Sequence, residues 1–522
     1  MSIKDKLRGS LSYDLPAALV VFLVALPLCL GIALGSKAPL FSGIIAGIVG
    51  GIVVGAISGS HLSVSGPAAG LTTIVAAAIG RMPVYEAFLL AVVMAGVIQI
   101  ILGNLRAGFL GDFVPSSVIK GMLAAIGLML ILKQMPHLIG YDADFMGDEE
   151  FFQPDHENTF TELLQSVNFL SPGAMLIGVL AIVIQIIWEG KFFKSHKVLS
   201  LIPAPLIVVI MGIASNQIYI AFNPDLAVKP EHMVNIPVAQ SFTEFKSFFT
   251  MPNLKYLNNI DVWVTAGTIA IVASLESLLS LEASDKLDPY KRLSPPNREL
   301  VAQGSGNIVS GMLGGLPVTA VIVRSSANIN AGARTKFSAI FHGVLLLVCV
   351  VFIPTVLNLI PLSALAGILI FVGFKLAKPS VFKDVFKRGW PQFVPFIVTI
   401  AAILLTDLLI GIFIGIGVAL FYLIRSNYRQ AVLVVNDGNS YLMRFRSEVS
   451  FLNKSYVRNW LESIPERSHV LIDASQSHYI DNDIIQDVQD FLEHAHLKEI
   501  SVEFKRSKNG KDHFNKMKND EE

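Results

Sequence analysis

The sequence predicts an α-helical membrane protein with fourteen transmembrane segments and a small C-terminal α/β domain. Hydrophobic residues make up 53% of the 522 residues and charged residues only 15%, whereas soluble domains carry about 25% charged residues. The apolar residues are concentrated in residues 15–425, and from residue 426 the composition is that of an ordinary soluble domain. We therefore expect a cytoplasmic N-terminal segment at 1–14, a transmembrane domain at 15–425, the α/β domain at 426–507 and a polar tail at 508–522.

The composition argues against several classes of function. Lys and Arg (40 residues) balance Asp and Glu (40 residues), so the charge does not indicate a nucleic-acid partner. Cys29 and Cys349 lie inside apolar runs, which predicts buried thiols and not a disulfide or a metal cluster. Neither a nucleotide-binding loop nor a nucleophile motif is recognisable, so we expect a protein that is not an enzyme and holds no cofactor.

A run of about 20 apolar residues crosses the hydrocarbon core of a bilayer as one helix. Eleven runs meet this length, and three more are short or interrupted by Gly and Pro. The eleven begin near Leu15, Phe41, Val84, Ser116, Gly173, Leu201, Asp261, Phe337, Leu359, Pro391 and Leu408, and the three begin near Ser65, Leu300 and Pro317. Together they predict fourteen spans.

The charges of the loops orient these spans. The loop from His137 to Ser171 carries eight acidic residues and no Lys or Arg, so we expect it on the outside. The basic loops 189–200, 284–299 and 375–389 should face the cytoplasm, where Lys and Arg are enriched. With fourteen spans each loop falls on its expected side and both termini are cytoplasmic. This predicts a multi-pass protein of the cell inner (plasma) membrane.

Two interrupted segments, Ser65–Thr72 and Gly314–Ala320, point towards a binding site. Each places Gly and Pro before small residues and a short apolar helix. They would be the third and the tenth span, the same position in two halves of seven, and because seven is odd the second half would be inverted. A helix that begins in mid-membrane presents unpaired N–H groups and the positive end of its dipole, so two such starts facing each other can bind an anion. One segment alone would be better explained as a kink or a glycine-mediated helix contact.

Ionisable residues inside membrane spans are costly and are therefore functional candidates. Glu276 follows a long apolar run, and Ser280 lies four residues further on the same helical face. This pair could hold Na⁺ together with backbone carbonyls, or the carboxylate could bind a proton; the alternative is a structural carboxylate bonded to a neighbouring helix. Arg324 follows the second interrupted segment and could add positive potential beside an anion, or it could pair with Glu276 or extend to the cytoplasmic face.

In their order along the chain, these segments resemble the SulP family of anion transporters. That family includes bacterial sulfate and bicarbonate transporters and the animal anion exchangers with prestin. The resemblance covers nearly the whole chain, and its order and spacing are specific although each piece alone is weak. The pieces are Val64-Ser65-Gly66-Pro67, Leu275-Glu276-Ser277-Leu278-Leu279, Gly314-Gly315-Leu316-Pro317 with Arg324 and Asn328, and Gly332-Ala333-Arg334-Thr335-Lys336.

The resemblance implies a core domain of spans 1–4 and 8–11, a gate domain of spans 5–7 and 12–14, elevator-like motion of core against gate, and a homodimer. It implies that the anion and the coupling ion bind at two neighbouring sets of residues. The anion set is Ala69, Gly70, Thr72, Ala320, Val321 and Ile322, beside Arg324. The coupling set is Glu276 and Ser280, which is also the one place where a metal ion, Na⁺, could bind.

The coupling ion and the substrate stay open between two alternatives each. Sodium–bicarbonate members of the family place Asp at the position of Glu276, Thr at that of Ser280 and Thr at that of Ile322. Glu at the first position is more typical of proton-coupled members, so both H⁺ and Na⁺ remain candidates. The stretch 281–289 resembles a bacterial branch linked to carbonic anhydrase, which favours bicarbonate over sulfate by association.

The C-terminal region has the pattern of a small α/β domain. Alternating residues from Tyr441 to Phe451 predict a strand, 470–473 a buried strand, 484–494 an amphipathic helix, and 500–504 another strand. The region resembles the STAS domain that ends SulP transporters, with Asp473, Ser475 and Asp481 at its strand–loop–helix junction. Anti-sigma-factor antagonists end this junction in a phosphorylated serine, which this chain lacks there. We therefore expect a module for folding and for trafficking of the dimer, and not a phosphoswitch.

These observations predict a secondary active transporter of a small inorganic anion, bicarbonate or sulfate, coupled to H⁺ or Na⁺. An anion exchanger or channel on the same fold is the alternative. A permease for nucleobases or other organic solutes is a further hypothesis, but it would need polar side chains to bind its solute. The predicted half-helix starts carry mainly Ala, Gly and Val, which suits a small anion held by backbone N–H groups.

Overall fold

The computed structural model describes residues 3–109, 114–142, 146, 151, 158–190, 193, 202–239 and 241–505. The chain divides into two compact units, residues 1–416 and 417–522. The division falls inside helix α20 (Leu408–Gln430), slightly before the predicted limit at residue 425. The predicted polar tail, residues 508–522, lies outside the described residues.

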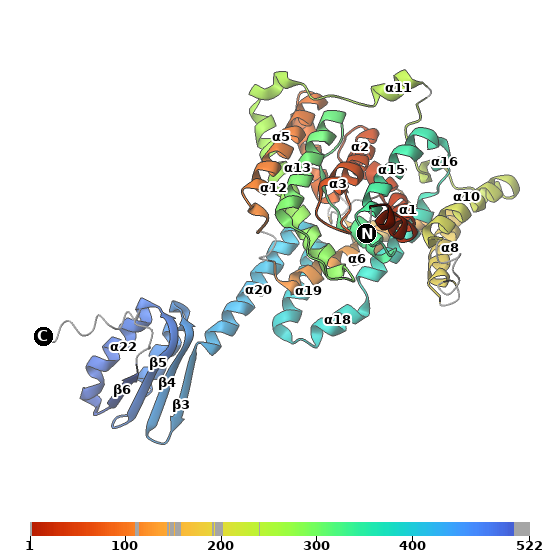
Figure 1. The fold of residues 1–522 in the computed structure, drawn as a ribbon. Coiled ribbons are helices and arrows are strands. Elements are labelled where there is room, and N and C mark those ends of the chain that lie inside the picture. The colour runs from red at the N-terminus through yellow and green to blue at the C-terminus, as the bar shows by residue number, and fades with distance from the viewer. Residues whose placement is uncertain are drawn as a thin grey trace. The chain divides into compact units, whose positions relative to one another are not determined.

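The first unit is almost entirely helical (Figure 1). Its first half contains α1 (Ile3–Gly35), α2 (Leu40–Val49), the π-helix η1 (Gly50–Val54), α3 (Gly55–Ile57), β1 (Ser65–Pro67), the 3-10 turn η2 (Ala69–Leu71), α4 (Thr72–Arg81), α5 (Tyr85–Asn104), α6 (Ser116–Ile139), α7 (Thr159–Ser166), η4 (Val167–Phe169), α8 (Pro172–Trp188), α10 (Ala204–Phe222), η6 (Pro224–Leu226) and η7 (Pro230–His232). Its second half contains α11 (Phe242–Ser247), η8 (Leu254–Asn258), α12 (Ile260–Leu287), α13 (Pro296–Leu313), β2 (Val318–Ala320), α14 (Ile322–Asn330), α15 (Phe337–Phe352), α16 (Pro354–Leu357), α17 (Leu362–Leu376), α18 (Pro379–Phe386), α19 (Trp390–Leu405) and the start of α20.

Each predicted span coincides with a helix, although the helices differ in length. Within the described residues, eight helices are long and apolar enough to cross a bilayer, and a ninth results if the bent pair Thr159–Phe169 and Pro172–Trp188 counts as one span. Shorter apolar helices lie at Ala69–Arg81, Phe337–Phe352 and Trp390–Leu405. The chain is therefore a multi-pass membrane protein, and the number of fourteen spans stays a prediction.

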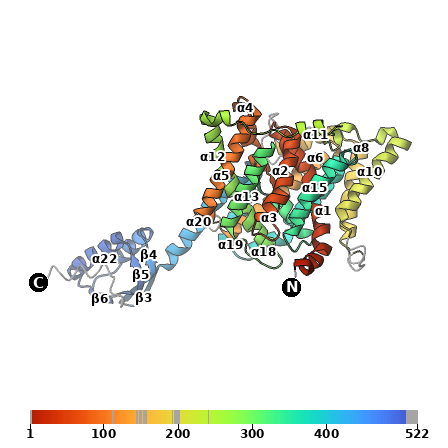
Figure 2. The same ribbon diagram turned by 45° about the horizontal axis from the view of Figure 1, so that its top comes forward.

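Helix contacts in the first unit come in matching pairs. Helix α1 packs on α15 as α12 packs on α5, and α6 packs on α19 as α17 packs on α8. Figure 2 shows α1 and α15 running side by side. If each half is counted as seven spans, these pairs are the contacts that a pseudo-twofold axis in the membrane plane would relate. The contacts therefore agree with the predicted inverted repeat.

Close glycine contacts hold together two groups of helices. They are the predicted core (α1–α5 and α12–α15) and the predicted gate (α6, α8, α10, α17, α19 and the start of α20). In the core, a Cβ atom added to Gly96 of α5 would lie 2.5 Å from the carbonyl oxygen of Gly304 of α13, and the reciprocal distance is also 2.5 Å. In the gate, Gly127 of α6 and Gly373 of α17 approach each other in the same way, at 2.6 Å. Only glycine allows two membrane helices to pack this closely.

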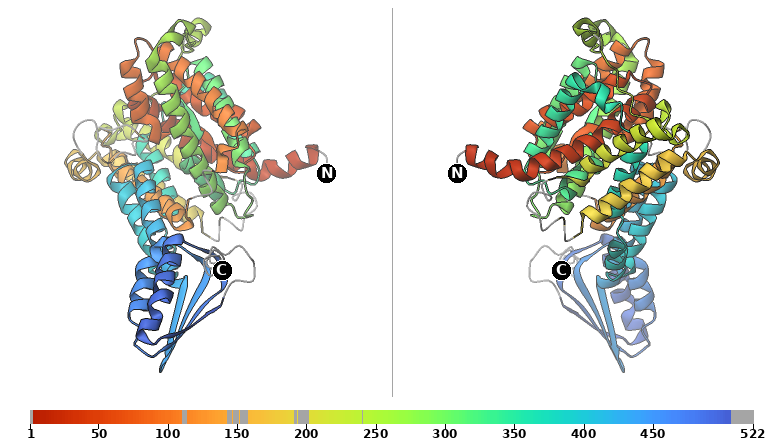
Figure 3. Two further views of the ribbon diagram at one scale, coloured as in Figure 1. Left: turned by 90° about the vertical axis from the view of Figure 1, so that its left-hand side faces the viewer. Right: turned by 90° about the vertical axis from the view of Figure 1, so that its right-hand side faces the viewer.

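The second unit contains a four-stranded sheet in the order β3 (Val432–Asp437), β4 (Ser440–Val449), β5 (His469–Ile480) and β6 (Ser501–Lys505). Strand β3 is antiparallel to β4, whereas β4, β5 and β6 are parallel. Helices α21 (Lys454–Glu462) and α22 (Asn482–Ala495) pack on the sheet, and Figure 3 shows them on one face. The predicted strands and helix are confirmed, while β3 and α21 were not predicted.

The predicted strand–loop–helix junction of the second unit is held by local hydrogen bonds. The Asp473 carboxylate accepts from the hydroxyl of Ser475 at 2.6 Å and from Arg444 Nε at 2.8 Å. These bonds lower the pKa of Asp473, the Ser475 hydroxyl contributing most. Asp481 caps α22 by accepting from the Asp483 amide. The identification of this unit as a STAS domain stays a proposal.

Candidate functional site

The two interrupted segments meet as a pair of short antiparallel strands. Strand β1 pairs with β2 in the register Ser65–Ala320, Gly66–Thr319 and Pro67–Val318. Each strand leads directly into a short helix, β1 through η2 into α4, and β2 into α14. Neither helix start is closed by a side-chain cap, since neither Ala68 nor Val321 makes a capping hydrogen bond. The strand pair thus joins the two predicted half-helix starts, which are the predicted anion site.

Helix α12 contacts both half-helix starts through consecutive residues. A Cβ atom added to Gly70 would lie 3.4 Å from Oε1 of Glu276, so the carboxylate faces the first turn of the α4 segment. The next residue, Ser277, accepts a hydrogen bond from the Ala320 amide at 3.2 Å. Glu276 is only 6% exposed. The structure therefore brings the predicted coupling residue next to Gly70, one of the predicted anion residues.

The second predicted coupling residue, Ser280, is also buried on α12. It lies four residues after Glu276, so its side chain points to the same side of the helix. Its carbonyl accepts from the hydroxyl of Ser284 at 2.7 Å. The pair of a carboxylate and a hydroxyl on one buried helix face, as the spacing predicted, is present in the structure.

Two of the backbone amides that were predicted to meet the anion already donate hydrogen bonds within the protein. The Ala320 N–H donates to Ser277, and the Val321 N–H donates to the carbonyl of Val64 at 3.0 Å. Ile322 is the first residue of α14 itself. Of the three predicted amides on this side, we therefore expect that of Ile322, with those after it in the first turn, to be the one that faces an anion.

Two threonine hydroxyls add potential donors beside the helix starts. Thr72 begins α4, and Thr319 is the middle residue of β2. Both oxygens are buried and, within the described part of the chain, have no hydrogen-bond partner. Thr72 was predicted as a site residue. Thr319 was not, because in the sequence it is one more small residue of the interrupted segment.

Arg324 is buried behind the strand pair, with an exposure of 0%. Its Nη2 donates to the Cys29 sulfur of α1 at 3.3 Å, while Nε and Nη1 have no hydrogen-bond partner among the described residues. A Cβ atom added to Gly66 of β1 would lie 2.0 Å from Nη1, so only glycine leaves room for the guanidinium. Arg324 therefore does not extend to the cytoplasmic face, and its charge lies beside the strands.

Helix α13 holds β2 through side chains that sequence reasoning did not single out. Asn307 accepts from the Val318 amide at 2.6 Å and donates to the Val318 carbonyl at 3.0 Å. The Ser310 hydroxyl donates to the carbonyl of Leu316 at 2.6 Å. Polar residues on one face of a membrane helix are the sequence signal that could have indicated this role.

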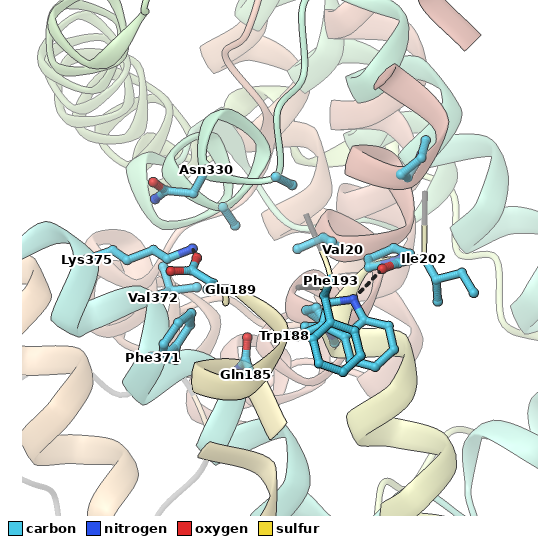
Figure 4. Close-up of a pocket in the computed structure, with 16 residues that line it drawn as sticks. Val20, Gln185, Trp188, Glu189, Phe193, Ile202, Asn330, Phe371, Val372 and Lys375 are labelled. Carbon is cyan, nitrogen blue, oxygen red and sulfur yellow. Dashed lines mark hydrogen bonds and ion pairs between the residues drawn. The ribbon is translucent and has the colours of Figure 1, made fainter. Parts of the chain in front are cut away.

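A cavity of about 180 Å³ lies between predicted core helices α1 and α14 and predicted gate helices α8, α10 and α17 (Figure 4). Lys375 forms an ion pair with Glu189 at its wall, and Asn330 at the end of α14 also lines it. The Trp188 indole N–H donates to the carbonyl of Ile202 at 2.9 Å. The loop charges predict that this is the cytoplasmic side. The half-helix α14 therefore borders a space between the two helix groups.

A separate ionisable cluster lies on the side predicted to be external. Asp142 interacts with His137 through one carboxylate oxygen and with His232 through the other, at 2.5 Å in the second case. Glu231 lies 3.6 Å from the far nitrogen of His232. Burial raises the pKa of Asp142, but the hydrogen bonds and charges of the two histidines outweigh it, so that this pKa is lowered. The cluster ties η7 to the end of α6.

Comparisons with known proteins identify a family and a shared fold. The model of the sulfate permease family matches residues 11–401. YvdB of Bacillus subtilis (strain 168), whose name refers to sulfate transport, is 29% identical over 414 residues, 79% of this chain and 73% of that protein. The bicarbonate transporter BicA of Picosynechococcus sp. is 25% identical over 475 residues, 88% of this chain and 79% of that protein. The solved structure of SLC26A9 covers 97% of this chain and 85% of its own, with a TM-score of 0.66 and 15% identity, which shows a shared fold.

Proposed function

This chain belongs to the sulfate permease family of anion transporters, and on that basis we propose that it is a secondary active transporter of bicarbonate or sulfate, coupled to H⁺ or Na⁺. Membership in this family makes it a membrane transporter and not an enzyme. The names of its relatives are divided between sulfate and bicarbonate. Both anions are therefore proposed as candidate substrates.

The observation that carries the proposal is that both half-helix segments contact α12, through its consecutive residues Glu276 and Ser277. An anion between the starts of α4 and α14 would be stabilised by their unpaired amides and by the buried charge of Arg324. Glu276 lies against Gly70, so its negative charge would oppose the anion unless a cation or a proton neutralises it. Binding of the anion and of the coupling ion would then favour each other, which is what a symporter requires.

The division of helices into two groups supports elevator-like motion. Both half-helices belong to the predicted core, whereas α6, α8, α10, α17, α19 and the start of α20 correspond to the predicted gate. The cavity between the two groups borders α14, so movement of core against gate would carry the anion site past it. Further parts of the proposal are a homodimer, location in the inner membrane with both termini cytoplasmic, and a functional link to a carbonic anhydrase.

The test is flux into proteoliposomes that contain the purified full chain. Labelled bicarbonate and labelled sulfate are supplied in turn, each under a Na⁺ gradient alone and under a pH gradient alone. Accumulation of one anion under one gradient is the expected result and identifies both substrate and coupling ion. Uptake that requires an anion on the opposite side would instead indicate an exchanger, and current without accumulation would indicate a channel. Uptake of a nucleobase but of neither anion would contradict the proposal.

A further inference from the structure

One face of α13 carries four polar side chains, at positions 299, 303, 307 and 310. Asn307 and Ser310 hold β2 and the residues before it, as described above. The other two, Gln303 and Glu299, lie one turn and two turns before Asn307, closer to the start of the helix. All four are at most 1% exposed. Glu299 is thus a further buried carboxyl group in the predicted core, besides Asp14 and Glu276. The proposed coupling by Glu276 does not involve it.

The Glu299 carboxylate is held by neutral donors. The Ser58 hydroxyl donates to Oε2, and Gln303 Nε2 donates to Oε1 at 2.7 Å. Within the described part of the chain, Glu299 forms no ion pair. The charged groups facing it are Arg298, whose Nε donates to the Ile57 carbonyl at 2.7 Å, and Asp285, which accepts two hydrogen bonds from Ser294. A buried carboxylate with no paired cation is costly when ionised, and it gains by binding a proton.

Gln303 connects this carboxyl group to the anion site. The same Nε2 that donates to Glu299 also donates to the hydroxyl oxygen of Ser65 at 2.8 Å. Ser65 is the first residue of β1, the strand that leads into α4. The other end of the Gln303 amide, Oε1, is buried and has no partner among the described residues. The amide therefore lies between the carboxyl group and β1 with its oxygen unused.

We propose that Glu299 is a proton-binding site and that Gln303 transmits its protonation to β1. In the ionised state, Glu299 accepts from Gln303, and the Ser65 oxygen also accepts from Gln303, which leaves the Ser65 hydroxyl proton free to donate elsewhere. When Glu299 binds one proton from the aqueous phase, its new O–H group needs an acceptor. A half-turn of the Gln303 amide supplies one, because Oε1 then accepts both from Glu299 and from the Ser65 hydroxyl. No covalent bond other than the new O–H bond changes.

Protonation would thus convert Ser65 from an acceptor into a donor committed to Gln303. Glu276 acts at the Gly70 end of the segment from β1 to α4, and Glu299 acts at its Ser65 end. This inference rests on the proposed anion transport by that segment. Glu299 is a positioning residue here, because its effect reaches the anion site through Gln303 and Ser65.

The first test compares the pH dependence of anion uptake by the full chain in proteoliposomes, from about pH 5 to about pH 8. Glu299→Gln keeps the shape of the side chain and cannot titrate. We expect it to flatten the pH profile: the ratio of initial rates at the two ends of this range should fall by about fivefold, the equivalent of one hydrogen bond. The matched control is Glu282→Gln, whose carboxylate pairs with Lys286 at 3.1 Å nearer the surface; its profile should equal that of the unmodified protein. A Glu299→Gln protein with an unchanged profile, at any absolute rate, overturns the inference.

A second variant and a second measurement cover the case in which Glu299→Gln does not fold. Gln303→Leu retains the carboxyl group but removes the connection to Ser65, so it should flatten the pH profile as Glu299→Gln does. Independently of transport, infrared difference spectra between acid and alkaline pH should contain a band of a buried protonated carboxyl group that persists in Glu276→Gln and vanishes in Glu299→Gln. Failure of the unmodified protein to transport either anion would contradict the proposed function, whereas absence of this infrared band would contradict proton binding at Glu299.

Discussion

The two half-helix segments share a backbone design but differ in the charge placed beside them. Each consists of a three-residue strand followed by an uncapped helix start. The α4 segment has the Glu276 carboxylate against Gly70, while the α14 segment carries Arg324, whose guanidinium lies against Gly66 of the opposite strand. The near-symmetric backbone thus provides two positive helix ends for the proposed anion. A carboxylate, where the proposed coupling ion would bind, lies beside one of them, and a guanidinium lies beside the other.

The two segments also differ in how their strands are held. Strand β2 is held from outside by Asn307 and Ser277, through hydrogen bonds to Val318 and Ala320. Strand β1 is held by Gln303, which contacts the Ser65 hydroxyl and not the backbone. Because only the β1 attachment includes a side chain linked to a carboxyl group, we expect β1 to respond to protonation and β2 to remain fixed.

The largest expected effect is that of Glu276→Gln, which removes the charge on the α4 side. Coupling between two binding sites is typically worth about 5- to 150-fold in affinity, and we expect loss of cation-driven accumulation at the upper end of this range. The protein should still fold, because the amide replaces the carboxylate without a change of shape. The measurement is gradient-driven uptake in proteoliposomes. Full cation-dependent uptake by this variant would rule out the assigned role.

The next effect is that of Arg324→Gln, which removes the charge on the α14 side. We expect the KM for the anion to rise about tenfold, the equivalent of about 1.4 kcal/mol, with the choice of coupling ion unchanged. The matched control is Arg106→Gln, since Arg106 is exposed. An Arg324→Gln protein with an unaltered KM and a changed coupling ion would reverse the division of roles between the two segments.

Substitution of Gly50, which contacts the start of β1, and of Gly315, which precedes β2, tests how differently the two strands are held. A Cβ atom at Gly50 of η1 would lie 2.4 Å from the carbonyl oxygen of Ser65, which is backbone, whereas one at Gly315 would meet side chains, Ser310 Oγ at 2.3 Å and Ile45 Cγ2 at 2.7 Å. Backbone cannot move aside as a side chain can. Gly50→Ala should therefore cost about 1–3 kcal/mol of stability and Gly315→Ala less. Thermal unfolding in detergent is the measurement, and the opposite order would contradict this account.

The smallest effect on transport is expected for Asp142→Asn, outside both segments. The pKa of Asp142 is lowered in the folded protein, so its contribution to stability is complete above its unfolded pKa and is lost as the pH falls through the folded value. The variant should lower stability by about 2 kcal/mol at neutral pH, and the difference should shrink below about pH 4. Coupling should be unchanged. A changed coupling ion in this variant would show that the external cluster belongs to the transport mechanism.

Much of the fold was accessible from the sequence because its signals are local. Each apolar run that was predicted as a span coincides with a helix. The Gly and Pro residues of Ser65–Thr72 and Gly314–Ala320 predicted both helix breaks. The strand at Ser440–Val449 and the helix at Asn482–Ala495 followed from periodicity. Strand β3 and helix α21 were missed, although both carry a local signal. Residues 432–435 are all apolar, and Val457 and Leu461 lie one turn apart on the buried face of α21.

The site was accessible only in part. The spacing predicted that Glu276 and Ser280 lie on one face of a helix. It could not predict that the Ser277 hydroxyl accepts a hydrogen bond from the Ala320 amide, because that bond joins residues 43 positions apart. The polar residues of α13 are visible at intervals of about four, yet the sequence does not show what lies opposite them. The contact of Arg324 with Cys29 joins residues 295 positions apart.

By itself, the sequence determined that this chain crosses a membrane many times and breaks two of its helices at matching positions, because hydrophobicity and backbone freedom are properties of consecutive residues. Only the tertiary structure decided which charge meets which helix start. Glu276 faces Gly70, Arg324 lies against Gly66, and Glu299 is linked through Gln303 to Ser65. These neighbours are set by how helices from the two halves pack together, and the physical reason is that electrostatic effects depend on distances in space, which packing determines.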